Sequence, residues 1–413
     1  MLPLSLSRLR SPVAALLALG ALAGCTLLGG GETPQPQPLP QASAAPPIAT
    51  APLATTPLAT TPLAPSVPAT VVANKVGVGV LLPLSGPSAA LGQAMLDAAE
   101  MALFDLGGDQ IALLVRDSGG TPQAAAAAAR SAIRDGARIL LGPLLAAEVE
   151  GAKPVAADAH VPLVAFSTAT RLAGDGTWLM SFDPRQEIER VVLYADHHGR
   201  TRFAALAPQG AYGDLAVEAL RQSVGLAGAN LGRIARYGDG GDVAPAVQAF
   251  AAGLETDAVL LPDGGARLKR VAPLLPFDGI DLDKVKLLGT GLWADSSIGT
   301  EPTLDGGWYA APNPATRTQF EKRFETLYKR PPPLLATLGY DATALAAVLA
   351  RTPGGPNFTA AGLTNPSGFS GLNGIFRLLP NGMVERGLAV LQVEHDGATV
   401  IDPAPQSFER PGS

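Results

Sequence analysis

The stretch that decides the fold is Val76-Gly-Val-Gly-Val-Leu-Leu-Pro-Leu84, followed by a helical pattern at about 89–106 and by Ile111-Ala-Leu-Leu-Val115. Val76–Leu84 is a continuous apolar run, which is typical of a strand buried on both faces. The next segment has apolar residues at helical spacing, and the second apolar run is again short enough for a strand. This order predicts the start of a parallel sheet covered by helices.

The same alternation continues along the chain and restarts after Phe182-Asp183-Pro184. The further predicted strands lie, with helices between most of them, at about 138–142, 162–166, 202–207, 231–237, 257–261, 285–289 and 308–311. Two long helices are predicted at about 314–328 and 335–351. Two α/β series of this length predict two lobes with a cleft between them.

The C-terminal part follows a different pattern. Gly374–Leu379 and Leu388–Val393 are apolar, and Pro380-Asn-Gly382 lies between them. Because Asn-Gly between apolar segments favours a tight turn, the sequence predicts a hairpin made by these two segments.

Composition excludes several classes of protein. The chain has 413 residues, 30 Lys and Arg against 36 Asp and Glu, and one cysteine. A net charge of −6 argues against nucleic acid as the main partner, which requires a basic surface. A single cysteine excludes an internal disulfide framework and a thiolate metal cluster.

The first residues are predicted to be a secretory signal. Arg8 and Arg10 precede the apolar run Val13–Ala23, which is shorter than the roughly 20 residues of a membrane-spanning helix. Leu22-Ala23-Gly24-Cys25 resembles the lipobox of bacterial lipoproteins, and this resemblance implies cleavage before Cys25 and attachment of lipid to it. Thr26 follows, rather than the aspartate of inner-membrane lipoproteins, so we expect the outer membrane. The alternative is an ordinary secretory signal that ends near a cysteine.

The segment 25–74 is predicted to be a disordered linker. Eleven prolines lie between Pro34 and Thr70, and a Pro-Leu-Ala pentad occurs three times from Ala51 onward. Proline fixes φ and removes a hydrogen-bond donor, so we expect an extended polyproline II segment. It is either a passive spacer or a tether that carries the folded domain toward a partner.

Several segments of the folded part resemble the leucine/isoleucine/valine-binding family of periplasmic solute-binding proteins (type I fold). The matching segments are Leu82-Pro-Leu-Ser-Gly-Pro87, Leu141-Gly-Pro143, Pro162-Leu-Val-Ala-Phe-Ser167, Ala211-Tyr-Gly213 and Phe369-Ser-Gly-Leu-Asn-Gly374. The resemblance implies an α/β fold of two Rossmann-like lobes with parallel central sheets, joined by three crossovers near Asp183, Pro312 and Gly368.

The resemblance also sets expected boundaries. The signal peptide is 1–24, the linker 25–74, the binding domain 75–400 and the tail 401–413. Lobe 1 is expected at about 75–183 plus 313–368, and lobe 2 at about 184–312 plus 369–400. Within the family, Ala165-Phe-Ser-Thr and Asp183-Pro-Arg-Gln-Glu-Ile-Glu-Arg-Val-Val192 resemble the lipid-anchored activators of penicillin-binding proteins.

The candidate ligand-binding residues lie where strands end and helices begin. They are Ser85, Ser167, Thr168, Ala169, Thr170, Tyr212, Asp263 and Trp293. The resemblance implies that residues 167–170 bind an α-carboxylate, at the carboxyl end of a strand where open α/β sheets bind ligands. The alternative is a Ser/Thr-rich turn. Tyr212 is expected to close over a ligand, or else to fasten the start of a helix.

An amino-acid site also needs a carboxylate for the α-ammonium group. Relatives present an acidic residue in the turn Gly289–Trp293, but this sequence has no acid there until Asp295. Asp263 could substitute, although we expect it to be an exposed helix cap. The loop after Gly142 likewise lacks the serine of transport proteins. Because an unsatisfied buried group costs about 1–3 kcal/mol, these departures argue against a high-affinity transport receptor.

No catalytic motif is found, so we expect neither an enzyme nor a cofactor. His197 and His198 close a helix, where a cation is favoured, and we expect no metal site. The first functional hypothesis is a non-catalytic, lipid-anchored periplasmic binding protein that regulates peptidoglycan synthesis by contacting a penicillin-binding protein. The alternative is the substrate-binding component of a branched-chain amino-acid ABC transporter, which would bind a small amino-acid-like ligand.

Overall fold

The computed structural model describes residues 75–238, 241–395 and 397–408. The signal peptide, the lipidation of Cys25 and the linker predicted for residues 1–74 lie outside the described residues.

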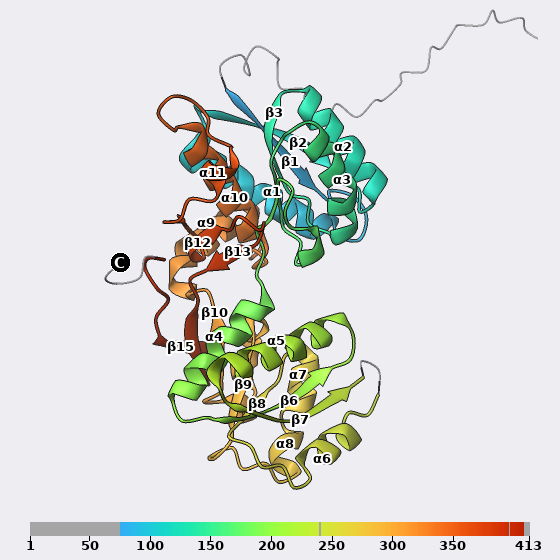
Figure 1. The fold of residues 1–413 in the computed structure, drawn as a ribbon, viewed down its shortest axis with the longest axis vertical. Helices are drawn as coiled ribbons and strands as arrows, with labels where there is room; N and C mark the ends of the chain where they lie inside the picture. The colour runs from blue at the N-terminus through green and yellow to red at the C-terminus, as the bar shows by residue number, and fades with distance from the viewer. Residues whose placement is uncertain (1–74, 239–240, 396, 409–413) are drawn as a thin grey trace, which may run out of the picture. The chain divides into compact units, whose positions relative to one another are not determined.

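Five parallel strands form the first sheet, in the order β2-β1-β3-β4-β5 (Figure 1). These strands are β1 (Val76–Leu82), β2 (Ile111–Asp117), β3 (Ala137–Leu141), β4 (Leu163–Ala165) and β5 (Thr177–Leu179). Neighbouring side chains of β1 are buried in different core clusters, because successive residues of a strand point to opposite faces. Both faces of the sheet are therefore covered, as the continuous apolar runs predict.

Helices cover the two faces of the first sheet. α1 (Ala89–Ala102) and α10 (Ala336–Ala350) pack on one face, and α2 (Pro122–Arg134) and α3 (Ala146–Asp158) pack on the other. Thr121 caps α2 by accepting a hydrogen bond from the backbone N–H of Ala124, and Pro122 occupies the first helical position. This is the usual composition of a helix start.

α1 and α10 approach each other closely at Gly339. A Cβ atom at this position would lie 2.2 Å from the carbonyl oxygen of Met95, so the two helices have no room for it. We expect Gly339→Ala to lower the free energy of unfolding by about 1–3 kcal/mol, the usual cost of overpacking. Chemical denaturation measures this change. Gly225→Ala in α5 (Ala211–Ala227) is the matched control, because a Cβ there meets nothing within 4 Å. A loss of the same size in both variants would contradict the packing argument.

The second sheet has seven strands, in the order β15-β14-β10-β9-β8-β6-β7. They are β6 (Arg202–Pro208), β7 (Asn230–Tyr237), β8 (Ala258–Leu260), β9 (Lys286–Gly289), β10 (Trp308–Ala311), β14 (Ala389–Glu394) and β15 (Gly397–Asp402). The strands from β10 to β7 are parallel, whereas β14 runs antiparallel to both β10 and β15. α4 (Pro184–His197) and α5 pack on one face, and α6 (Ala244–Ala251), α7 (Gly265–Val271) and α8 (Leu274–Phe277) pack on the other. The predicted α/β class with two parallel-sheet lobes is confirmed.

The chain passes between the two sheets three times. It leaves β5 for α4 at residues 180–183, and it leaves β10 at 312–317 for α9 (Thr318–Tyr328) and α10. A small antiparallel sheet follows, made of β11 (Phe369–Gly371), β12 (Gly374–Leu378) and β13 (Val384–Arg386). Its residues Phe376, Leu378 and Val384 join the core beside the first sheet. By these contacts the third passage lies at 387–388, later in the chain than Gly368.

The predicted C-terminal hairpin is partly wrong. The turn at residues 380–382 is present, but β12 pairs with β13, and not with Leu388–Val393. The latter segment forms β14, which lies between β10 and β15. The reason is burial: four of the six residues of β14 are buried, so the strand belongs inside a large sheet and not in an exposed hairpin.

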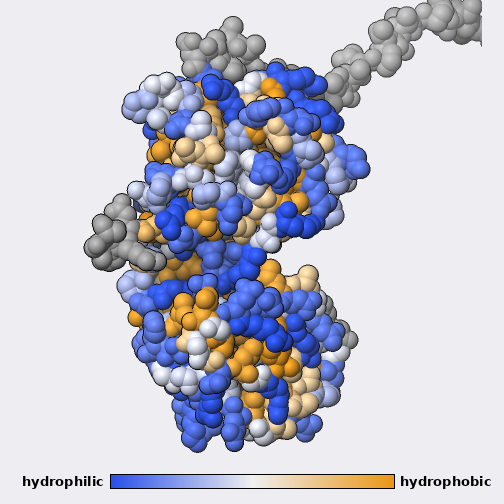
Figure 2. Space-filling model, in the orientation of Figure 1, coloured by the Kyte–Doolittle hydropathy of each residue, from blue (hydrophilic) through white to orange (hydrophobic). Residues whose placement is uncertain are grey.

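The surface mixes polar and apolar residues. Figure 2 shows apolar residues interspersed with hydrophilic ones over the visible face. This agrees with a chain in which only 16% of residues are charged.

Candidate functional site

The loop Ser167–Thr170 follows β4 at its carboxyl end. Ser167 is buried, and its Oγ accepts a hydrogen bond from the backbone N–H of Ala169 (3.2 Å). Ala169 and Thr170 are half-buried, whereas Thr168 is exposed. Ser167 therefore forms the local turn that was the alternative interpretation, and Thr168 presents the most accessible hydroxyl of the loop.

Ser85 lies in the exposed loop after β1, beside Asp117 at the end of β2. The Asp117 carboxylate accepts hydrogen bonds from the backbone N–H groups of Leu84 and Gly119, both at 2.9 Å. Although burial opposes the effect, hydrogen bonds from Ser85, Gly119 and Leu84 hold the pKa of Asp117 below its ordinary value. Asp117 thus fixes the loop that carries Ser85.

Tyr212 lies in the first turn of α5, above the second sheet. Its hydroxyl is 2.9 Å from Oγ1 of Thr290, a fully buried residue in the turn after β9. Burial raises the pKa of the Tyr212 hydroxyl, which therefore stays protonated at neutral pH. This hydrogen bond fastens the start of α5 to the β9 turn, as the second interpretation of Tyr212 expected.

Asp263 follows β8 and is buried, so the expectation of an exposed cap is wrong. Its carboxylate accepts hydrogen bonds from the Tyr237 hydroxyl (2.6 Å), the Arg267 guanidinium (2.5 and 3.0 Å) and the Gly264 N–H (2.8 Å). The cation and the two neutral donors occupy both oxygens. Asp263 is thereby neutralised locally and is a poor receptor for a ligand's ammonium group.

Trp293 belongs to the hydrophobic core. Only 2% of its surface is exposed, and its ring centroid lies 6.3 Å from that of Tyr309. Its ring lies over the backbone of Gly289, where a Cβ atom would meet a ring carbon at 2.1 Å. The structure therefore places this candidate in the packing of the second sheet, away from the hydroxyl loop.

Glu187, in the first turn of α4, was not among the candidates. Its Oε2 accepts a hydrogen bond from the backbone N–H of Gly291 (2.8 Å), in the turn after β9. A Cβ atom at Gly291 would come within 2.6 Å of the other oxygen, Oε1. The carboxylate thus occupies the place of a side chain at 291, in the turn where the family resemblance expected an acidic residue.

The electrostatic surroundings of Glu187 are unusual for a glutamate. Burial, and to a smaller extent the nearby Asp183, raise the pKa of Glu187 to about 7, against the Gly291 hydrogen bond and the charge of Arg386. Arg386 is itself buried, and its guanidinium carbon lies 4.8 Å from the ring centroid of Phe182. Glu187 is consequently poised between its charged and neutral forms near neutral pH.

A signal for Glu187 exists in the sequence. Residues 187, 191 and 195 are spaced by four, which places them on one face of α4, and Val191 and Ala195 are apolar. A glutamate on the buried stripe of a helix is a candidate for a functional site, because isolated buried carboxylates are costly.

A cavity of about 850 Å³ adjoins this turn. Its walls come from the loops after β8 and β9, the beginning of α9, and the segment joining α9 to α10. The lining residues include Asp263, Gly264, Gly291, Leu292, Asp295, Arg317, Pro332, Leu334 and Thr337. The volume lies within the range of small-molecule sites. The cavity therefore provides space for a small solute beside the turn that Glu187 supports.

Comparison with known proteins gives the family. A family model described as periplasmic binding protein matches residues 75–398, so the chain belongs to the periplasmic binding protein family. It is a non-enzymatic binding protein with the type I fold.

Solved structures share this fold. A branched-chain amino-acid ABC transporter periplasmic ligand-binding protein from Burkholderia xenovorans is 21% identical, with a TM-score of 0.67, over 81% of this chain and 97% of that chain. A solute-binding protein of an ABC transporter from Rhodopseudomonas palustris, in complex with 3,4-dihydroxybenzoic acid, is 17% identical, with a TM-score of 0.61, over 82% of this chain and 99% of that chain.

A curated relative matches a smaller part. An uncharacterized protein of Rickettsia prowazekii is 28% identical over 139 residues, which are 33% of this chain and 37% of that protein. Within the described residues, no helix is long and apolar enough to span a membrane. The same residues contain no cluster of three or more His, Cys, Asp or Glu side chains suited to a metal ion.

Proposed function

We propose that this chain is the solute-binding component of an ABC importer of the branched-chain amino-acid type, and that its ligand is a small carboxylate. Family membership supports a binding role. The Burkholderia relative belongs to a branched-chain amino-acid transporter, and the Rhodopseudomonas relative binds an aromatic carboxylate. A carboxylate is the group that these two ligand classes share.

The observation that carries the proposal is the cavity of about 850 Å³ beside the β9 turn, where Glu187 is bound to the backbone of Gly291. Thr168 offers an exposed hydroxyl after β4, suited to accompany backbone N–H groups in binding a carboxylate. Glu187 supplies a carboxylate at Gly291, suited to a ligand's ammonium group. A bound ammonium group would favour the charged form of Glu187, so an amino acid would bind more tightly above pH 7 than below it.

Replacing Thr168 by valine tests the carboxylate-binding role. We expect Thr168→Val to weaken binding of the recognised carboxylate by about tenfold, because a hydrogen bond to a charged group contributes about 1.5–3 kcal/mol. Leucine, isoleucine, valine and benzoate are screened by thermal shift, and the binder is then measured by calorimetry. At a concentration of one hundred times the Kd, a ligand stabilises the folded state by about 2.7 kcal/mol.

The control is Thr201→Val, at the amino end of β6, where strand ends do not bind ligands. We expect no change in Kd for this variant. Equal affinity in the wild-type protein and Thr168→Val would remove the loop from the site, and absence of saturable stabilisation by every compound would contradict the transport proposal.

A second candidate function is a lipid-anchored regulator of peptidoglycan synthesis that contacts a penicillin-binding protein at the outer membrane. The supporting observation is Asp263, whose carboxylate is occupied by Arg267 and Tyr237 and is therefore lost to an amino-acid ligand. Direct binding of a purified penicillin-binding protein, without a response to any carboxylate, would favour this function. Lipid on Cys25 is tested by mass spectrometry of the mature protein.

A further inference from the structure

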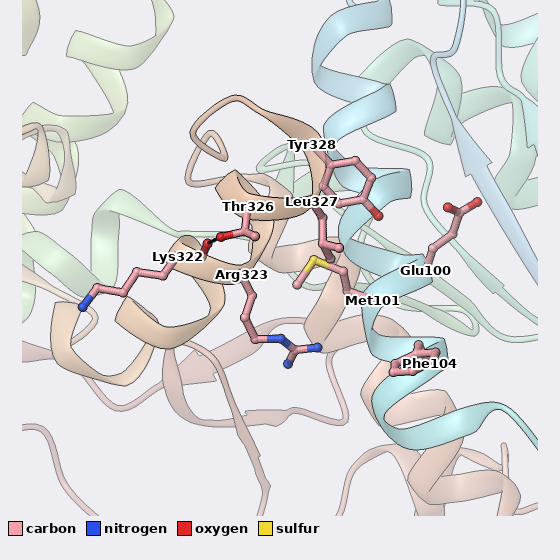
Figure 3. Close-up of a pocket in the computed structure, with 8 residues that line it drawn as sticks. All are labelled: Glu100, Met101, Phe104, Lys322, Arg323, Thr326, Leu327 and Tyr328. Carbon is pink, nitrogen blue, oxygen red and sulfur yellow. Dashed lines mark hydrogen bonds between the residues drawn. The ribbon is translucent and has the colours of Figure 1, made fainter.

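A second hollow lies on the outside of the first sheet's helices, and it shares no lining residue with the cavity beside the β9 turn. It has a volume of about 490 Å³ and lies between the end of α1 and α9 (Figure 3). Met101, Leu327 and Tyr328 line it, and Phe104 stands at its edge. Phe104 is 85% exposed and Leu327 is 59% exposed, which is unusual for large apolar side chains.

The backbone segment that carries Phe104 is held in place by hydrogen bonds. Phe104 lies in a π-helical turn, Leu103–Gly107, that continues α1. The next residue, Asp105, accepts hydrogen bonds from both terminal nitrogens of Arg323 on α9 (2.9 and 2.8 Å) and from the Tyr340 hydroxyl of α10 (3.0 Å). These bonds connect the π turn to both neighbouring helices. The backbone that carries Phe104 is thus fixed against both helices, which reduces the entropy cost of docking.

Two opposite charges flank the hollow. Glu100 of α1 and Lys322 of α9 both line it, and Figure 3 shows their side chains extending on opposite sides of the apolar residues. Among the described residues, neither forms a salt bridge. Burial, and then repulsion from Asp97, raise the pKa of Glu100 above its ordinary value, as expected for a carboxylate without a nearby cation.

We propose that this surface is an interface between two copies of the chain. In a two-fold dimer both protomers use the same surface, so a residue of one protomer contacts a different residue of that surface in its partner, and the reverse contact also forms. The surface must therefore be complementary to itself. This patch is self-complementary in shape, because it carries both a projecting ring and an apolar hollow. It is also self-complementary in charge, since Glu100 of one protomer would face Lys322 of its partner twice. The inference is independent of the solute-binding function.

Sedimentation velocity of the purified full chain at increasing concentration tests the interface. We expect a reversible dimer in the wild-type protein. Phe104→Ser should raise the dimer Kd at least tenfold, because buried aromatic anchors dominate interface energies. Phe277→Ser is the matched control, because Phe277 on α8 is also 85% exposed but lies outside the hollow. It should leave the Kd unchanged.

Charge reversal tests the geometry. Glu100→Lys and Lys322→Glu should each weaken the dimer severalfold, and the double variant should recover most of the wild-type affinity. A wild-type protein that remains monomeric at all concentrations overturns the proposal. Equal weakening by Phe104→Ser and Phe277→Ser also overturns it, since association would then be nonspecific. Failure of the double variant to recover rejects the two-fold pairing.

Discussion

Replacing Trp293 by alanine is expected to lower the free energy of unfolding by about 3–5 kcal/mol, the usual cost of removing a large aromatic side chain from a core. The ring is 2% exposed and packs over Gly289 beside Tyr309, so its removal leaves a cavity that the rigid strand β9 cannot fill. Urea denaturation followed by circular dichroism measures the loss. The binding free energy of the ligand to the folded protein should change much less than the free energy of unfolding.

Trp293→Phe is the control for Trp293→Ala at the same position. It keeps an aromatic ring and removes the indole N–H, which is buried without a hydrogen-bond partner. We therefore expect a loss of about 1 kcal/mol, because most of the packing remains. If Trp293→Ala abolished binding while leaving the unfolding midpoint unchanged, Trp293 would be a ligand residue, and its assignment to the core would be incorrect.

Replacing Glu187 by glutamine is expected to remove a pH dependence of stability. Burial raises the pKa of Glu187 from its ordinary value of 4.5 to about 7 in the folded state, so the folded state binds the proton more tightly than the unfolded state. This contribution is fully present below pH 4.5, is lost as the pH rises, and is gone above about pH 7. The change across this window is about 3 kcal/mol, at 1.36 kcal/mol for each unit of pKa. Above pH 7, Glu187→Gln should accordingly be more stable than the wild-type protein.

The measurement is urea denaturation of both proteins at closely spaced pH values from 4.5 to 8. Glu189→Gln is the control, because Glu189 is exposed on the same helix. It should retain the wild-type profile. Parallel wild-type and Glu187→Gln profiles over this range would show that Glu187 has an ordinary pKa, and the expected dependence of amino-acid binding on pH would fail with it.

Most of the fold could be predicted because the informative signal is local. Val76–Leu84 and Arg202–Ala207 read as buried strands from their continuous apolar runs, and both are strands of parallel sheets in the structure. The partner of Gly374–Leu379 could not be predicted in the same way. The sequence shows that Leu388–Val393 is a strand, but its pairing with Trp308–Ala311 depends on contacts between distant parts of the chain.

The candidate site was less predictable, since a residue's chemistry depends on its neighbours in space. From the sequence, Asp263 is expected to cap a helix. Only the fold brings Tyr237 and Arg267 to its carboxylate. Trp293 lies close in sequence to the β9 turn, yet its ring points into the core. Glu187 reaches the same turn across more than one hundred residues of sequence. Strand ends could be located from the sequence, whereas the partners of each polar group could not.

The strand order of the seven-stranded sheet also affects how the protein is made. β10 gains its neighbour β14 only after the ribosome has added α9, α10 and the whole three-stranded sheet. Until then one edge of β10 is unpaired, and such edges readily recruit other polypeptides. The greatest risk of aggregation during biosynthesis therefore comes late, and it ends when the last two strands emerge and complete the sheet.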